Sequence, residues 1–342
     1  MQSGPSPGPA WTKVAPIADL PALALERGGS TEAVQRRWIW YFCRGDLGED
    51  EGEAFCRGAT NVAQPRAAGP RMIAPSTNPL LSLAVGFALV YAIILSCYFG
   101  TCLIVTWLGR RRPDYKIQKD RQAPSGQIKR DIRASISSLA AISFFFTLGA
   151  WFHYQFGWGY KIQRMTITNT IVSFGFSMLV FDTWFYWFHR LLHTRWFFKR
   201  THRWHHRIRT PVAWSNDSDT LADNCFLQSY WAFAYFIFPI SPVVLLAHKI
   251  YDLVTGCIGH SGYEYTGRLS LPPSPLISVT HHDQHHRYSR CNYSTHFTIW
   301  DRLMGTLCRE HDAEAARNIR GTINLTAVGS RLTGQRGRRF RS

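Results

Sequence analysis

A long uncharged segment constrains this chain more than any other feature of its sequence. No Asp, Glu, Lys or Arg occurs from Met72 to Gly109, and the apolar run at 79–108 exceeds the ~20 residues that span a bilayer as a helix. Backbone polar groups in lipid must be bonded within the protein, which limits spanning structures to helices and closed barrels. We therefore expect an integral membrane protein with helical spans.

Further apolar segments indicate more than one helix in the membrane. The uncharged stretches at 134–160 and 166–181 predict a helical hairpin, joined by aromatic and basic residues that suit an interface. A third stretch at 224–247 is interrupted by PISP at 239–242, and we expect a partly inserted or tightly bent hairpin there. The predicted fold is all-α, with three to five bilayer helices and a cytosolic, histidine-rich helical cap.

The composition changes along the chain and predicts four parts. Residues 1–78 are rich in Gly, Pro and Ala in their first seventy positions and read as a poorly ordered extension. Residues 79–170 would hold transmembrane helices and a basic cytosolic loop. Residues 171–307 would form the catalytic domain, and residues 308–342 a basic tail.

The basic residues predict which side of the membrane the histidines face. The chain has a formal net charge of +17, with nine Lys or Arg against three Asp at 109–133 and seven more without any acid at 189–210. The positive-inside rule places both segments in the cytoplasm. Because these charges lie beside apolar runs, we favour a membrane surface and expect no nucleic-acid partner.

Eight histidines fall into three clusters in which members three or four positions apart would share one helical face. The clusters are His189 and His193, then His202, His205 and His206, then His282, His285 and His286. One such cluster is weak evidence, but three beside membrane spans indicate a metal site. Eight imidazoles exceed the roughly four ligands of one zinc ion and suit two first-row metal ions.

Imidazole suits zinc, copper, iron and nickel, so ligand type alone does not select the metal. The membrane setting favours oxygen activation on a lipid chain. His281 lies about 100° around a helix from its neighbour, away from the face shared by the third cluster. We expect it to be at most peripheral, and its replacement to be milder than that of the other three histidines in HHDQHH.

These motifs resemble the fatty acid hydroxylase superfamily, also called the sterol desaturase family, of membrane di-iron enzymes. The resemblance rests on the three clusters, on DTW at 182–184, on GHSGYE at 259–264 and on CNYSTHFTIWDRLMGT at 291–306. It implies that the eight histidines bind two iron ions that reduce O2 and oxidise an unactivated C–H bond. It also implies electrons from NAD(P)H through a reductase, often with a b-type cytochrome, and an endoplasmic reticulum location.

The resemblance extends to residues outside the three clusters. His260 matches a ninth ligand, whereas Glu264 stands where the fatty acid hydroxylase branch has another histidine, and we favour a supporting role for it. Asp182 and Asp283 could accept the outer N–H of ligand imidazoles, with helix capping or solvation as the alternative. Asn292 resembles the family's Asn-Tyr position and could bond a metal-bound water.

The leading hypothesis is a lipid hydroxylase with a sterol as first substrate. A desaturase, or a hydroxylase of fatty acyl, sphingoid or carotenoid chains, stays open within the same family. From another class, the alternatives are a non-catalytic membrane zinc-binding or metal-transport protein and an inactive scaffold; zinc could also occupy the site in isolated protein. Transport is disfavoured because the runs at 79–108 and 134–152 contain no acid, base or histidine.

The remaining histidines and the cysteines give weaker signals. We expect packing or interfacial roles for His153, His248, Tyr293, His296 and His311. The eight cysteines form no CxxC pair, and we expect them to be reduced and mostly packed.

Overall fold

The computed structural model describes residues 78–162 and 165–324, and within these ranges the chain is helical. No strand forms among the described residues; the two β-bridges, Lys116 with Tyr263 and Leu276 with Phe297, are isolated. The predictions for the N-terminal extension, except at Asn78, and for the chain beyond residue 324 lie outside the described residues. The all-α prediction is confirmed.

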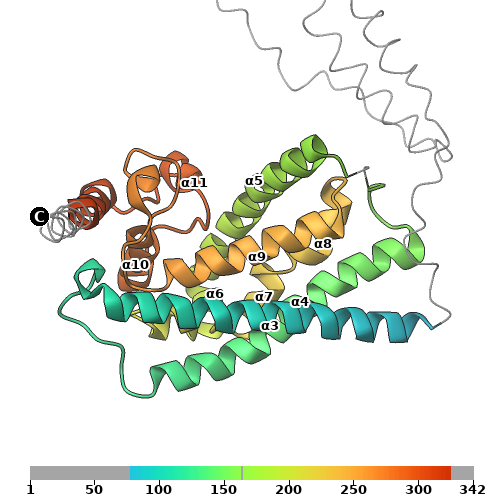
Figure 1. The fold of residues 1–342 in the computed structure, drawn as a ribbon, viewed down its shortest axis with the longest axis horizontal. Coiled ribbons are helices and arrows are strands. Elements are labelled where there is room, and N and C mark those ends of the chain that lie inside the picture. Colours follow the sequence, from blue (N-terminus) through green and yellow to red (C-terminus); the bar gives the residue numbers. More distant parts are fainter. Residues whose placement is uncertain (1–77, 163–164, 325–342) are drawn as a thin grey trace, which may run out of the picture. The chain divides into compact units, whose positions relative to one another are not determined.

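Among the described residues, four helices are long and apolar enough to cross a bilayer, a number within the predicted range. They are α3 (Pro79–Arg111), α4 (Gln127–Phe156), α5 (Ile167–Leu192) and α9 (Pro242–Gly259), drawn from blue to orange in Figure 1. The most apolar window of α3 is only 6% buried within the protein. Its exposed leucines form an apolar surface of the kind that lipid covers.

Local sequence explains where these helices begin and end. The side chain of Asn78 accepts a hydrogen bond from Leu81 N at 3.1 Å and caps α3, which has Pro79 at its first position. Arg110 and Arg111 occupy the last turn, where cations favour the helix dipole. The apolar helix is therefore bounded by residues that suit the two membrane–water interfaces.

The apolar stretch at 224–247 bends where PISP predicts. The short α8 (Tyr230–Ile237) ends before this sequence, and α9 begins at Pro242. Eight residues are too few to cross a membrane as a helix. Ser241 caps α9 through a bond from Val243 N, so the break is built into the sequence.

The loop that carries the second histidine cluster packs onto the transmembrane helices. Short α6 (Arg195–Arg200) precedes it and α7 (Leu221–Leu227) follows it. Trp214 of this loop joins a buried core cluster with Tyr98 of α3, whose hydroxyl donates to the Trp214 carbonyl at 2.7 Å. The second cluster is thereby held against the membrane helices.

The third cluster lies on α10 (Val279–Tyr288), which contacts α9; α11 (Ile299–Leu303) follows along the chain, and both are labelled in Figure 1. Residues 311–324 form a further helical segment. Contrary to the expectation that all cysteines are reduced, Cys291 and Cys308 form a disulfide. The chain returns on itself between them and brings their Cα atoms to 5.3 Å, a fold-level proximity that their spacing does not reveal.

Candidate metal centre

Nine histidines from the described part of the chain gather into two groups in space. Within each group the ligand-capable nitrogens lie within 4.8 Å of one another. The five-histidine group contains His189, His193, His202, His206 and His285. The four-histidine group contains His205, His260, His282 and His286.

The two groups cut across the sequence clusters. Only the first cluster, at the end of α5, contributes to a single group, whereas the second and third clusters each divide between both groups. The expected helix for the second cluster does not form: residues 201–204 make turns and His205–Arg207 a 3-10 helix. The tighter path directs the His205 imidazole away from the group that contains His202 and His206.

Backbone carbonyls orient most of the imidazoles through Nδ1. A carbonyl only accepts, so each Nδ1 bonded to one carries the proton and leaves the lone pair on Nε2. The pairs are His189 with Tyr293 O at 2.8 Å, His193 with Ser289 O at 3.0 Å, His260 with Gly256 O at 2.9 Å, His285 with Cys291 O at 2.7 Å and His286 with Ile208 O at 2.7 Å. These bonds set the tautomer that metal binding requires.

Two aspartates that the sequence analysis missed lie beside two of the three second-cluster imidazoles, while Nδ1 of the third, His206, lies 2.9 Å from Oγ of Ser289. Asp223 Oδ1 lies 3.2 Å from Nδ1 of His202, and Asp219 Oδ1 lies 2.9 Å from Nδ1 of His205. Carboxylate–imidazole pairs of this kind raise the basicity of metal ligands. The only signal in the sequence is the run of aspartates in NDSDTLAD directly after the second cluster.

The nitrogens that face the centre of each group fit a bound cation. In the five-histidine group, three buried nitrogens have no hydrogen-bond partner: Nε2 of His193, His206 and His285. In the four-histidine group, Nε2 of His260 lies 2.9 Å from that of His282 and 3.2 Å from that of His286. Because His260 and His286 keep their protons on Nδ1, their lone pairs face each other, an arrangement that a metal ion would stabilise.

Burial keeps most of these imidazoles in the neutral form that binds metal. Desolvation lowers the pKa of His260 and of His285 to about 3, and neighbouring imidazoles act in the same direction on His260. The same two causes lower the pKa of His206. Burial also disfavours the charged form of His205, but the carboxylate of Asp219 has the larger effect, so the pKa of His205 is raised.

His281 and Glu264 lie outside both groups. His281 is fully buried and its Nε2 lies 3.0 Å from Asp301 Oδ2. Glu264 is also fully buried, and it accepts bonds from the backbone N–H and the hydroxyl of Thr280 at 2.9 and 2.7 Å. It therefore stabilises the positive N-terminal end of α10 rather than an imidazole.

The expectation that Asp182 and Asp283 accept imidazole N–H groups is wrong. Asp182 accepts three backbone N–H bonds, from Thr295, His296 and Phe297, at 3.2, 2.7 and 3.2 Å. Asp283 instead binds Gln118 at 2.9 Å and Arg287 at 2.6 Å. Both carboxylates hold the chain around the histidines: Asp182 through a segment far along the chain, and Asp283 through the distant Gln118 and through Arg287 of its own helix.

Asn292 also differs from its expected role beside a metal-bound water. Its side chain donates to His281 O and to Gln284 Oε1, and it accepts from Cys308 N at 2.8 Å. The backbone adopts a left-handed φ of 61°, which asparagine tolerates better than most residues. All of these bonds serve the loop between α10 and α11.

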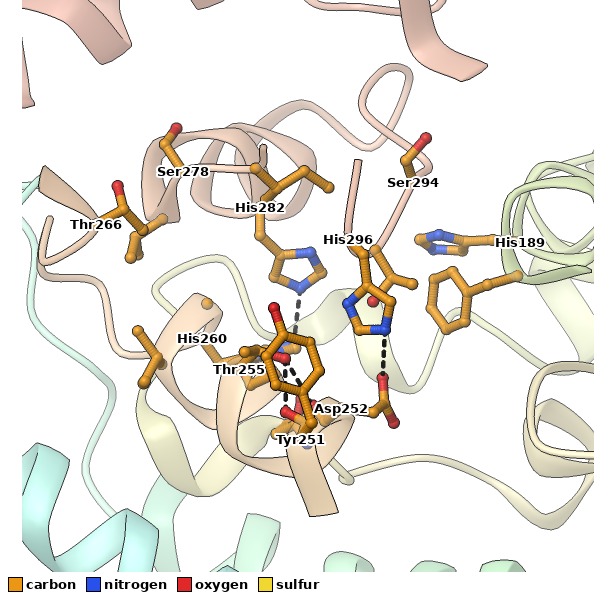
Figure 2. A pocket seen from close by; sticks show the side chains of 18 of the residues that line it. His189, Tyr251, Asp252, Thr255, His260, Thr266, Ser278, His282, Ser294 and His296 are labelled. Carbon is orange, nitrogen blue, oxygen red and sulfur yellow. Dashed lines mark hydrogen bonds and ion pairs between the residues drawn. The ribbon is translucent and has the colours of Figure 1, made fainter. Parts of the chain in front are cut away.

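A cavity of about 340 Å³ opens onto both histidine groups. It is lined by His189 and His202 of one group and by His205, His260 and His282 of the other. Apolar side chains complete much of the wall, among them Phe185, Leu227, Leu269, Leu276 and Ile277. Figure 2 shows His260 and His282 directed toward each other beside this space, with His189 on another side.

Comparison with known proteins shows which family this site resembles. Residues 174–306 match the fatty acid hydroxylase family. Lathosterol oxidase from Homo sapiens is 30% identical over 204 residues, 56% of this chain and 65% of that protein. C-4 methylsterol oxidase erg25 from Schizosaccharomyces pombe is 27% identical over 169 residues, 47% of this chain and 56% of that protein.

Cholesterol 25-hydroxylase from Rattus norvegicus is 29% identical over 139 residues, 39% of this chain and 46% of that protein. The matched region thus spans about half to two thirds of these relatives. No solved structure matches the chain. The matched segment carries all nine grouped histidines, and this part of the chain is similar to the fatty acid hydroxylase family and, within it, to the sterol oxidases and hydroxylases named above.

Proposed function

We propose that this chain is a membrane-bound di-iron oxygenase that hydroxylates a lipid, with a sterol as the first candidate. The observation that carries the proposal is the cavity that opens onto both groups of histidines. A site of this kind brings a substrate carbon and the two metal positions to one place. The named relatives act on sterols, which supports the choice of substrate.

The five-histidine group would hold one iron and the four-histidine group the other. Iron bound there would supply the reduction of O2 and the removal of hydrogen from an unactivated C–H bond. One O2, two electrons and two protons would convert R–H into R–OH and water. We propose that the electrons come from NAD(P)H through a reductase and a b-type cytochrome.

The residues of this chain would orient ligands and substrate. The Nδ1 hydrogen bonds to backbone carbonyls and to Asp223, and the contact of His205 Nδ1 with Asp219, keep the Nε2 atoms directed inward. The apolar walls at Phe185, Leu276 and Ile277 would hold a hydrocarbon skeleton and exclude water. Other divalent ions, zinc among them, would fit the same nitrogens in isolated protein.

The proposed location is the endoplasmic reticulum membrane, with the histidines on the cytosolic side. Support comes from the basic residues at the end of α3, in the segment before α4 and around the second cluster. These basic segments lie at the ends of the membrane helices, and the histidine clusters follow such helix ends along the chain. The same arrangement would place the metal centre within reach of a cytosolic electron donor.

The test combines metal analysis with product analysis. Purified protein reconstituted with iron, a reductase and a sterol should contain two irons per chain and yield a product that has gained one oxygen. His205→Ala should lose about one of the two irons together with the product, whereas His153→Ala, at a histidine outside both groups, should keep both irons and the product. Loss of two hydrogens without gain of oxygen would indicate a desaturase, and stably bound metal without O2 consumption would refute an oxygenase.

A further inference from the structure

Three of the buried polar side chains that line the cavity belong to neither histidine group and come from α9 and the loop before α11. They are Asp252 of α9 and Ser294 and His296 of the loop before α11. Their exposed fractions are only 9%, 1% and 6%. Polar side chains this deeply buried need partners, since an unmade hydrogen bond costs the desolvation of the group.

Two of these side chains carry atoms that lack such partners. Neither Nε2 of His296 nor Oγ of Ser294 makes a hydrogen bond within the described chain. Both residues line the same cavity, and Figure 2 labels them on its wall. The expectation that His296 serves only packing is therefore incomplete. Although it contacts Phe181 and Tyr251 with its ring, its nitrogen faces a polar gap.

The separation between His296 and Asp252 is too long for a hydrogen bond but short enough for one oxygen atom to bridge from the side. Nε2 of His296 lies 3.7 Å from Oδ1 of Asp252, and a dashed line in Figure 2 joins the two side chains. An oxygen about 2.8 Å from each atom, to one side of the line between them, can contact both. A hydroxyl group suits both positions, because it can donate to the carboxylate and accept from an imidazole N–H.

The charges around this gap favour a neutral group. Oδ2 of Asp252 lies 2.7 Å from Nζ of Lys249, which is buried and also donates to Gln228. The ion pair has no net charge. Burial lowers the pKa of His296, so its imidazole adds none at neutral pH. A carboxylate ligand would be placed beside the carboxylate of Asp252 without a free cation to balance it.

The loop that presents His296 is also tied to a candidate metal ligand. Asp182 holds it through the backbone N–H groups of residues 295–297, and the carbonyl of Tyr293 accepts from Nδ1 of His189. The polar gap and the five-histidine group therefore share one fixed segment. A ligand anchored at the gap would have a defined position relative to the metal centre.

We propose that Asp252 and His296 form a subsite that binds a neutral hydroxyl group of the lipid and so orients it in the cavity. The inference rests on the proposed function, because it assumes that a lipid enters this cavity. It identifies the substrate class as a lipid alcohol rather than a free fatty acid. In this assignment the two side chains are positioning residues.

The test measures binding without turnover, on full-length protein in lipid nanodiscs. The probes are cholesterol and its analogue in which hydrogen replaces the hydroxyl. Wild-type protein should prefer cholesterol by on the order of 10- to 100-fold, the value of hydrogen bonds that involve a charged group. His296→Phe keeps the ring contacts and should remove most of this preference, whereas His296→Gln keeps a donor and should retain most of it.

A matched control lies in the same cavity wall. The hydroxyl of Thr255 already donates to the Tyr251 carbonyl at 2.8 Å, so Thr255→Val should leave the preference unchanged. Equal binding of the two probes by wild-type protein would overturn the proposed subsite. This comparison does not depend on the folding of any variant. A preference that survives in His296→Phe would overturn it as well. Failure to oxygenate either lipid would count against the proposed function alone, because the binding comparison needs neither metal nor O2.

Discussion

The imidazoles of His285 and His286 face different groups of histidines although the two residues are adjacent on α10. Their ring centroids lie 5.8 Å apart and their planes meet at 83°. The His285 ring is 4.5 Å from that of His189, and the His286 ring is 4.6 Å from that of His205. A single turn of α10 therefore contributes to both candidate metal positions.

This division predicts how metal content responds to paired substitutions. His285→Ala and His286→Ala should each reduce two irons per chain to about one, because each removes a nitrogen from one group only. Combining His285→Ala with His189→Ala, in the same group, should still leave about one. Combining His285→Ala with His286→Ala should remove both. Metal analysis of the purified variants measures the iron content. Loss of both irons from every single variant would contradict two separate metal positions.

His281→Ala provides the control, since this side chain belongs to neither group. It should retain two irons and yet lower the free energy of unfolding by about 1–3 kcal/mol, because the buried Asp301 loses its imidazole partner. Thermal unfolding measures the second effect. Loss of iron from this variant in its folded state would assign His281 to the metal centre.

The aspartates behind the second cluster should tune metal affinity. Asp219→Asn and Asp223→Asn replace the carboxylates that face Nδ1 of His205 and His202, and each should weaken iron binding about 10- to 100-fold without abolishing it. Competition with a chelator measures the affinity. Asp283→Asn is the matched control, since this buried carboxylate binds Gln118 and Arg287 and should leave affinity unchanged.

The buried imidazoles predict a stability that falls as pH falls. The pKa of His260 and of His285 is about 3 in the folded protein, because burial disfavours the charged form, against about 6.5 in an unfolded chain. Between these values the unfolded state binds more protons, so each such histidine lowers stability by up to about 1.4 kcal/mol per pH unit as the pH drops below about 6.5. Metal-free protein should show this decline in chemical denaturation.

His205 should make the two metals leave at different pH. Its pKa is raised, since Asp219 outweighs the effect of burial, and it should take up a proton before the other ligands. Dialysis at stepwise lower pH should therefore reduce the metal content first to about one ion and then to none. Asp219→Asn should bring the two steps together. Simultaneous loss from the wild-type protein would contradict this order.

Asn324 tests the proposed orientation. It is exposed at the end of the described chain and begins an Asn-Leu-Thr acceptor sequence for glycosylation. A cytosolic position predicts no glycan at Asn324. Wild-type protein from eukaryotic cells should therefore have the same gel mobility as Asn324→Gln, both before and after glycosidase treatment. A band shift present in wild type and absent from the variant would place this end of the chain in the lumen.

The sequence predicts those features that depend on local spacing. The uncharged run of α3 is enough to identify a span, and positions three and four apart are enough to single out the eight clustered histidines. The division of His285 and His286 between two groups depends on segments far apart in the chain, which spacing does not report. The second cluster also departs from helical geometry, because turns and a 3-10 helix replace the expected helix there.

The partners of the aspartates could be predicted from the sequence even less well. Asp182 and Asp283 lie next to motif histidines in the sequence, yet their partners are the 295–297 backbone and Gln118. Asp219 and Asp223 reach the imidazoles from a loop that only folding brings close. Proximity along the chain was a poor guide to which acid supports which ligand.

Helix α9 fixes the distance between the proposed hydroxyl subsite and the four-histidine group. It carries Asp252 near its middle and ends at His260, eight positions later, with both side chains on the same cavity. At 1.5 Å per residue this separates the two by about 12 Å along the axis. A lipid whose hydroxyl is bound at Asp252 would present to the four-histidine group a carbon several bonds away from that hydroxyl. The length of this helix segment would therefore determine which carbon is oxidised.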